Sequence, residues 1–202
     1  SYLLSFGDLH RHTDLSLCFP FFDGTYDDQF RYIIEVVEHD FVGITDHARD
    51  LSNGEVDSLV WRRSVKEVAR HRLVGRFIPY FAYERSQRQT DHNVISLKDD
   101  LLRPYEPHLQ DFWKEIDGDT FTIPHNTGSS PAMVQALWSI HDNEKRPLME
   151  IFQGCRANAD QNMAAMVRLG YSKGYRFGLI ASSDHLSTHR SYACVWSPKR
   201  ER

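Results

Sequence analysis

Short apolar runs that end in a histidine or an acidic residue recur along this 202-residue chain. The first run begins at Leu3 and leads through Gly-Asp-Leu to His10 and His12, which are one residue apart. Alternate residues of a strand point to the same face, so both imidazoles can aim at one divalent metal. The same His-x-His spacing would also arise from two solvent-exposed histidines at the end of a strand. The repetition of the pattern favours a metal site, because it returns at Asp46-His47, Glu84, His125 and Asp184-His185.

The hydrophobic pattern predicts strands that alternate with helices. Residues 26–39 carry apolar side chains at i, i+3, i+4 and i+7, which indicates an amphipathic helix. Residues 41–45 are almost wholly apolar, as expected of a parallel strand buried on both faces. Further helices are predicted at 58–72, 108–116, 131–139 and 160–170, and further strands at 77–83, 92–97, 121–124, 148–152, 177–182 and 192–196.

This alternation indicates an α/β domain built on a parallel sheet. An open doubly wound sheet would need a glycine-rich first turn, and residues 8–12 contain no glycine. In a barrel, every strand delivers its C-terminal residue to one rim, where active sites are built. Polar residues follow the C-terminal ends of at least four predicted strands. A barrel would bring these residues together at one rim. We expect a single domain over 1–202 with a distorted or seven-stranded barrel, because the chain is short for eight strand–helix units.

Charge and composition narrow the classes of partner. The net charge is −4, which gives no strong attraction to nucleic acid or to an anionic membrane. No apolar stretch approaches the ~20 residues that span a bilayer, so we expect a soluble protein. Three widely spaced cysteines, Cys18, Cys155 and Cys194, form no disulfide framework and favour a reducing compartment such as the cytoplasm. The first residue is serine, so a removed leader or a trimmed chain stays open.

Arginines accompany several of these histidines and carboxylates. Arg11 and Arg85 adjoin candidate ligands, and Arg156 follows the strand predicted at 148–152. Guanidinium groups grip phosphate or carboxylate with two parallel hydrogen bonds, so these three arginines are candidates for holding a substrate anion. Pairing with nearby acidic residues is the other interpretation. Glu150 also has two interpretations: it supports a metal-binding histidine, or it is only an acid at a strand end.

Taken in order, five segments resemble the motifs of the polymerase-and-histidinol-phosphatase (PHP) superfamily. They are residues 7–13 (GDLHRHT), 43–47 (GITDH), Glu84, 124–126 (PHN) and 181–185 (ASSDH). The resemblance covers nearly the whole chain and is closest to a bacterial branch of PHP-like hydrolases of unknown function. It implies a distorted (β/α)7 barrel of the PHP type. It also implies two or three divalent metal ions, Zn2+, Mn2+ or Fe2+, at the C-terminal ends of the strands.

The resemblance further implies which residues bind each ion. The first ion would be held by His10, His12, Glu84 and Asp184. Glu84 would bridge to a second ion, which would be held by His92 and His125. A third site would use His47 and His185.

The chain departs from the family pattern in two places. Ser-Leu-Cys occupies residues 16–18, where an aspartate or histidine that completes the third site is usual. The residues that remain as candidates for this role are Cys18, Asp14 and Asp23. Asp184 and His185 are adjacent, whereas one residue usually separates them, so the last ligand is either His185 or His189.

The function expected from these features is metal-dependent hydrolysis of a phosphate ester. A metal-bound hydroxide at a di- or trinuclear site would attack phosphorus. Catalytic roles are expected for Glu84, His185, Arg11, Arg85 and Arg156. The substrate would be a small anionic, phosphorylated molecule. Two alternatives stay open: an amide or ester hydrolase that uses the same site, and a non-catalytic module that only binds metal. The sequence gives no indication of oligomeric state.

Overall fold

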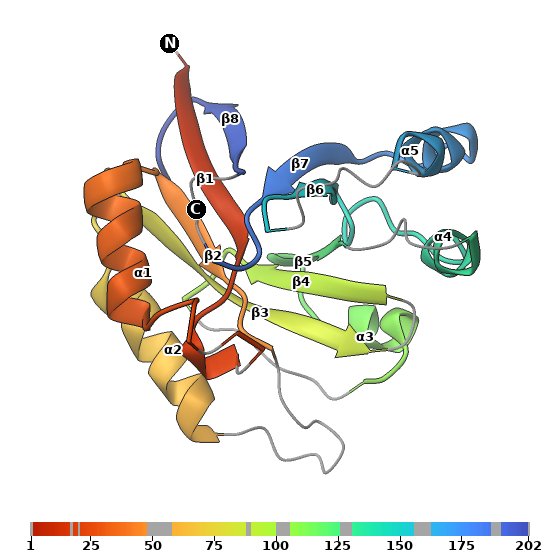
Figure 1. Ribbon diagram of the computed structural model, residues 1–202. Coiled ribbons are helices and arrows are strands. Elements are labelled where there is room, and N and C mark those ends of the chain that lie inside the picture. The colour runs from red at the N-terminus through yellow and green to blue at the C-terminus, as the bar shows by residue number, and fades with distance from the viewer. Residues whose placement is uncertain are drawn as a thin grey trace.

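Two β-sheets form the framework of the computed structural model (Figure 1). The structure describes residues 2–16, 18–19, 21–47, 58–87, 90–99, 106–125, 131–155, 163–186 and 191–201. The larger sheet has the order β5-β4-β3-β2-β1-β8, and the smaller one pairs β6 with β7. The strands are β1 (Leu3–Arg11), β2 (Phe41–Ile44), β3 (Ile78–Gln87), β4 (Thr90–Ser96), β5 (Thr120–Pro124), β6 (Leu148–Gln153), β7 (Gly178–Ser182) and β8 (Ala193–Ser197).

Helices flank both sheets. In Figure 1, α1 and α2 lie beside the larger sheet, and α4 and α5 lie on the side of β6 and β7. The helices are α1 (Tyr26–Tyr32), which a π-helical turn continues over Ile33–Val37, α2 (Ser58–Arg70), α3 (Leu109–Glu115), α4 (Pro131–Leu137) and α5 (Met163–Ser172). A capping box starts α1, because Thr25 and Asp28 each satisfy the other's backbone N–H. None of the described helices combines the length and the apolar character needed to cross a membrane.

The strand pairing corrects the expected (β/α)7 barrel. Only β1–β2, β2–β3 and β6–β7 pair in parallel, whereas β3–β4, β4–β5 and β1–β8 are antiparallel. The larger sheet curls into a half-barrel, and the described strands form no closed barrel. The end of β7 reaches β1 through an isolated bridge between Arg11 and Asp184 and a 2.8 Å bond from Asp184 N to the His10 carbonyl. The buried Asp8 carboxylate adds a 3.2 Å bond from Ser183 N.

Each face of the larger sheet carries its own core. On the outer face, Phe30, Val68 and Phe112 from α1, α2 and α3 pack with strand residues such as Val94. The inner face holds a second cluster that is made of Leu9, Phe41, Ile78, Ala82, Ile95, Ile123, Ile180 and Ala193. Successive strand residues alternate between faces, so Glu84 shares the inner face with Ala82. The Glu84 carboxylate therefore lies next to the apolar cluster of the inner face.

Gly7 permits the close pairing of β1 with β2. It lies opposite Phe41, and a Cβ at Gly7 would stand 2.3 Å from the Phe41 carbonyl oxygen. We expect Gly7→Ala to lower the free energy of unfolding by about 2 kcal/mol, because the two strands must separate to admit the methyl group. Gly118→Ala is the matched control, since a Cβ there meets no atom within 4 Å. Urea titration of both variants measures the difference, and equal midpoints would contradict the prediction.

Candidate metal centre

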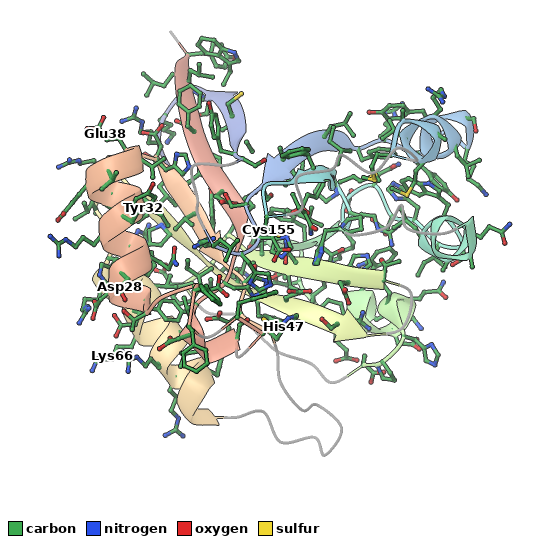
Figure 2. All side chains as sticks on the ribbon, viewed as in Figure 1. Asp28, Tyr32, Glu38, His47, Lys66 and Cys155 are labelled. Atoms are coloured by element: carbon green, nitrogen blue, oxygen red, sulfur yellow. The ribbon has the colours of Figure 1, made fainter. Side chains whose placement is uncertain are left out.

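Ionisable side chains from both sheets meet at the edge where β1, β2, β3, β5 and β7 end. Figure 2 labels one of them, His47, and also Cys155, whose sulfur lies 3.1 Å from Asp184 Oδ2. All of them are buried except His47, which is half-buried. The members are His10 and His12 at the end of β1, His47 after β2, Glu84 on β3, His125 after β5, and Asp184 and His185 after β7.

Four of these side chains surround one point. The Nε2 atoms of His10 and His12 are 3.2 Å apart. Asp184 Oδ1 lies 3.3 Å from the first of these atoms and 3.1 Å from the second. Glu84 Oε2 lies 3.1 Å from His12 Nε2 and 3.8 Å from His10 Nε2. Two imidazole nitrogens and two carboxylate oxygens are a ligand set that divalent transition metals accept.

Surrounding groups orient these rings from behind. Glu150 Oε2 lies 2.9 Å from His10 Nδ1, and Asp23 Oδ2 lies 2.8 Å from His185 Nδ1. A carboxylate on Nδ1 accepts its proton and leaves Nε2 with a free lone pair, as in metal-binding histidines. The Nε2 atoms of His10 and His185 each face Asp184 Oδ1 at 3.3 Å. Two acceptors in such contact require a proton or a cation between them, so these residues fit a divalent metal.

The pKa values of the cluster also indicate a site for a cation. Burial lowers the pKa of His12, but hydrogen bonds to Asp184 and Glu84 outweigh it and raise this pKa to about 9. Burial raises the pKa of Asp184, yet His10 and His12 hold it well below its usual range. Without a metal, the cluster therefore takes up protons to balance its carboxylates. A divalent ion that binds there must displace them.

Glu84 stands between two groups of histidines. Its Oε2 faces His12 at 3.1 Å and His47 Nδ1 at 3.3 Å, whereas its Oε1 faces His125 Nε2 at 3.3 Å. Burial raises the pKa of Glu84, and the charge of His125 together with hydrogen bonds from His10 and His12 lowers it well below the usual value. Glu84 is thus an anion whose two oxygens point to different partners. This geometry suits a carboxylate that is shared by two ions.

Cys18 joins this cluster from the loop after β1. Its sulfur and one ring nitrogen each of His12 and His47 lie within 4.8 Å of one another. Burial raises the pKa of the Cys18 thiol, but hydrogen bonds with His185 and His47 outweigh it and lower this pKa to about 5. Asp23, the second candidate for completing the third site, instead binds His185. Neither Asp14 nor Asp23 belongs to a group of candidate metal ligands among the described residues. His189 lies outside the described residues.

His92 does not join the cluster, which corrects the second-ion prediction. In the β3–β4 hairpin His92 lies opposite Arg85, whereas Glu84 lies opposite Asn93. Opposite residues of an antiparallel pair share a face, so His92 points away from Glu84. Its Nε2 accepts a 3.3 Å bond from the Arg146 guanidinium. Burial and the charge of Arg146 lower the pKa of His92 well below the ordinary value, so Arg146 already uses the nitrogen that a metal would need.

Asn93 takes the inward position instead and was not anticipated. Its side chain is fully buried, and neither amide atom has a hydrogen-bond partner in the described part of the chain. Only the register of the β3–β4 hairpin shows that Asn93 faces the cluster, because it places Asn93 opposite Glu84. The residue type alone gives no such signal. Gln153 was missed as well, and its Nε2 lies 3.2 Å from His125 Nδ1. Ser16 is a third, with its hydroxyl 2.6 Å from His12 Nδ1.

Arg11 has a structural role in place of the anion-binding role expected for it. The side chain is buried, and its Nε donates to Gln29 Oε1 at 2.8 Å. Its other two nitrogens donate to the carbonyls of Asp184 and Leu186 at 3.3 and 2.5 Å. Arg11 therefore fixes the backbone that carries Asp184 and His185.

Arg85 is also turned away from the cluster. It is buried, and it donates to the carbonyls of Glu106 and Pro107 and lies 5.1 Å from the centre of the Phe112 ring. These contacts correct the anion-binding role expected for Arg85, because they place its guanidinium on the outer face with α3. Arg156 lies outside the described residues.

Glu150 supports His10, as one of its two interpretations predicted. We expect Glu150→Gln to weaken metal binding about 10- to 100-fold, because a neutral amide no longer accepts the Nδ1 proton as strongly. The exposed Glu144→Gln is the control from the turn before the same strand. Competition with a coloured zinc chelator measures both affinities. A Glu150→Gln affinity equal to that of the control would make Glu150 a strand-end acid only.

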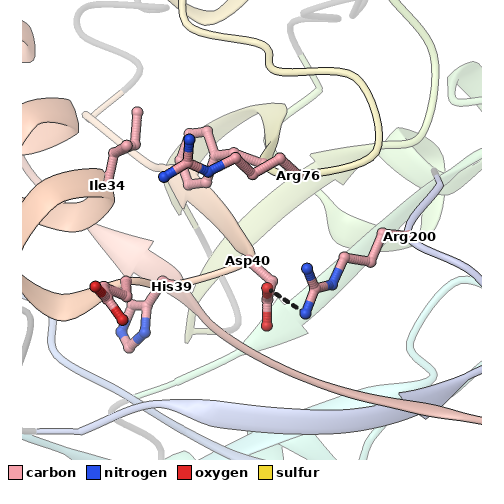
Figure 3. Close-up of a pocket in the computed structure, with 7 residues that line it drawn as sticks. Ile34, His39, Asp40, Arg76 and Arg200 are labelled. Carbon is pink, nitrogen blue, oxygen red and sulfur yellow. Dashed lines mark ion pairs between the residues drawn. The ribbon is translucent and has the colours of Figure 1, made fainter.

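A separate cavity of about 300 Å3 lies at the opposite ends of the strands. It is lined by residues that precede β2 and β3 and by Arg200 near the C-terminus. Figure 3 shows Arg200 paired with Asp40, and the two charged groups are 3.0 Å apart. The lining also includes one acidic residue, Glu38, and one further basic residue, Arg76. This cavity contains no group of candidate metal ligands among the described residues and is distinct from the centre.

Known proteins resemble the chain in structure and not in sequence. No family model matches it, and no curated protein matches it. One similar structure is a two-domain protein from Bacteroides vulgatus, described as containing a predicted PHP-like metal-dependent phosphoesterase, with a TM-score of 0.63 and 14% identity. The alignment covers 99% of this chain and 60% of that one. Another is PsfC from Pseudomonas syringae, with a TM-score of 0.56, 14% identity and coverage of 98% and 93%. The chain thus spans 60% of the length of the Bacteroides protein, and its fold is PHP-like.

Proposed function

We propose that this chain is a metal-dependent hydrolase of the PHP superfamily that cleaves phosphate esters. The observation that carries the proposal is the meeting of His10, His12, Glu84 and Asp184 around one point, with Glu150 holding the far side of His10. The similarity to a protein described as containing a predicted PHP-like metal-dependent phosphoesterase supports the same chemistry.

The proposed cofactors are two or three divalent ions, Zn2+, Mn2+ or Fe2+. His10, His12, Asp184 and Glu84 would hold one of them. Glu84 would share its other oxygen with an ion beside His125, and a third position would be formed by His47, His185 and Cys18. When bound, such ions polarise a substrate oxygen and supply a nucleophile by lowering the pKa of water.

The proposed substrate is a small phosphorylated anion that approaches from the side of His47, the half-buried member of the cluster. His185, which Asp23 orients through Nδ1, would offer its Nε2 to the third ion. Glu84 would hold two of the ions next to each other, with one carboxylate oxygen for each. Arg156 remains the candidate for gripping phosphoryl oxygens, because Arg11 and Arg85 are used within the fold.

A substrate panel with metal-loaded and chelated protein tests the proposal. Phosphate monoesters and diesters are compared with lactones and amides. We expect metal-dependent release of phosphate or alcohol from the phosphate esters, lost in His10→Ala and kept in His108→Ala, which removes an exposed histidine before α3. Turnover of lactones or amides alone would instead identify an amidohydrolase-like enzyme. Metal binding without any turnover would leave a metal-binding module.

A further inference from the structure

An exposed aromatic turn adjoins the metal centre and has no role in the proposed chemistry. Phe19, Phe21 and Phe22 are 48%, 93% and 69% exposed. Large apolar side chains that cluster on a protein surface often mark a binding site. The edge of the Phe19 ring packs against the His185 imidazole, with 4.7 Å between the ring centres. The aromatic turn is therefore continuous with the cluster.

Asp23 connects this turn to the centre through hydrogen bonds. Its backbone N–H and that of Phe22 both donate to the Phe19 carbonyl, at 3.1 and 2.9 Å. Its carboxylate binds His185 Nδ1 at 2.8 Å and Leu186 N at 2.9 Å. One buried carboxylate thus connects the aromatic residues to the segment that carries Asp184 and His185. Leu186, itself partly exposed, adds a fourth apolar side chain.

We infer that the substrate of this centre is a phosphate ester with an apolar organic group, and that Phe19, Phe21 and Phe22 form the wall that binds this group. This inference rests on the proposed function. An anion held among the histidines would have its next atoms beside Phe19, because that ring touches His185. The net charge of −4 disfavours an anionic lipid surface as the occupant.

Two phosphonates separate the contribution of the organic group from that of the anion. Methylphosphonate and benzylphosphonate carry the same anionic head, and neither can be hydrolysed at its C–P bond. Partial burial of one phenyl ring strengthens binding about tenfold. By titration calorimetry of the metal-loaded protein, we expect benzylphosphonate to bind about tenfold more tightly than methylphosphonate.

The double variant Phe21→Ala/Phe22→Ala should lose this preference and keep its affinity for methylphosphonate. Both side chains are exposed, so the fold should survive. Trp196→Ala is the matched control, since Trp196 is an exposed aromatic on β8, opposite Leu4 at the far end of β1. It should keep the full preference.

Equal affinities for the two phosphonates in the wild type, or the same loss of preference in Trp196→Ala as in the double variant, would overturn the aromatic wall and leave the hydrolase proposal standing. Failure of the metal-loaded protein to bind either phosphonate would overturn both.

Discussion

Glu84→Gln is expected to lose one metal ion per chain and to lower turnover about 10³-fold, which is about 4 kcal/mol of activation free energy. The substitution keeps the volume of the side chain but removes the charge that faces His12, His47 and His125. The amide also replaces one carboxylate oxygen with an NH2 group, which cannot bind a cation. Elemental analysis and turnover of the best phosphate ester measure the two effects.

Glu144→Gln is the control for this variant. Glu144 is an exposed glutamate in the turn before β6, and it belongs to no group of candidate metal ligands among the described residues. It should keep full metal content and activity. Full metal occupancy and activity in Glu84→Gln would reduce Glu84 to a buried acid that pairs with histidines.

Removal of metal is expected to destabilise the protein more at pH 9 than at pH 6.5. The folded-state pKa of His12 is raised from 6.5 to about 9, so its proton stabilises the metal-free fold fully below pH 6.5. This stabilisation, roughly 3 kcal/mol by the size of the shift, is lost as the pH rises through 9. Bound metal replaces the proton and does not lose its effect at high pH.

The measurement is the difference in Tm between metal-loaded and chelated protein across this pH range. We expect the difference to widen by roughly 10 °C, given 2–4 °C per kcal/mol in a domain of this size. In His12→Gln the widening should shrink, because this titrating group is gone. A difference that stays constant with pH in the wild type would mean that metal does not displace a proton from His12.

The sequence predicts the edge where the site lies, because the argument needs only the order of strands and their ends. Asp46-His47 and Asp184-His185 follow the ends of β2 and β7, and Glu84 lies near the end of β3. Bridges join His47 to Glu84 and Arg11 to Asp184, so these positions do meet. The predicted strands and helices match the observed ones to within a few residues. Hydrophobic periodicity carries that information locally.

Sequence could not predict which face a residue takes when the register of a hairpin decides it. His92 lies at the correct edge but begins an antiparallel strand, and a shift of one residue exchanges it with Asn93. The same limit applies to Arg11 and Arg85, whose partners are backbone carbonyls. A carbonyl has no residue type, so no sequence pattern distinguishes an arginine that binds backbone from one that binds substrate.

The centre draws its ligands from two sheets that no strand-to-strand ladder joins among the described residues. His10, His12 and Glu84 belong to the larger sheet, whereas Asp184 and His185 follow β7 of the smaller one. Asp8 and Ser183, which lie 175 residues apart in the chain, make one of the direct connections. Metal ions at this boundary would add coordination bonds between the two sheets and so lower the frequency at which β6 and β7 open locally. In deuterium exchange, chelation should then speed the amides of β6 and β7 first and leave β2 and β3 protected, so that the cofactor sets the order in which the molecule comes apart.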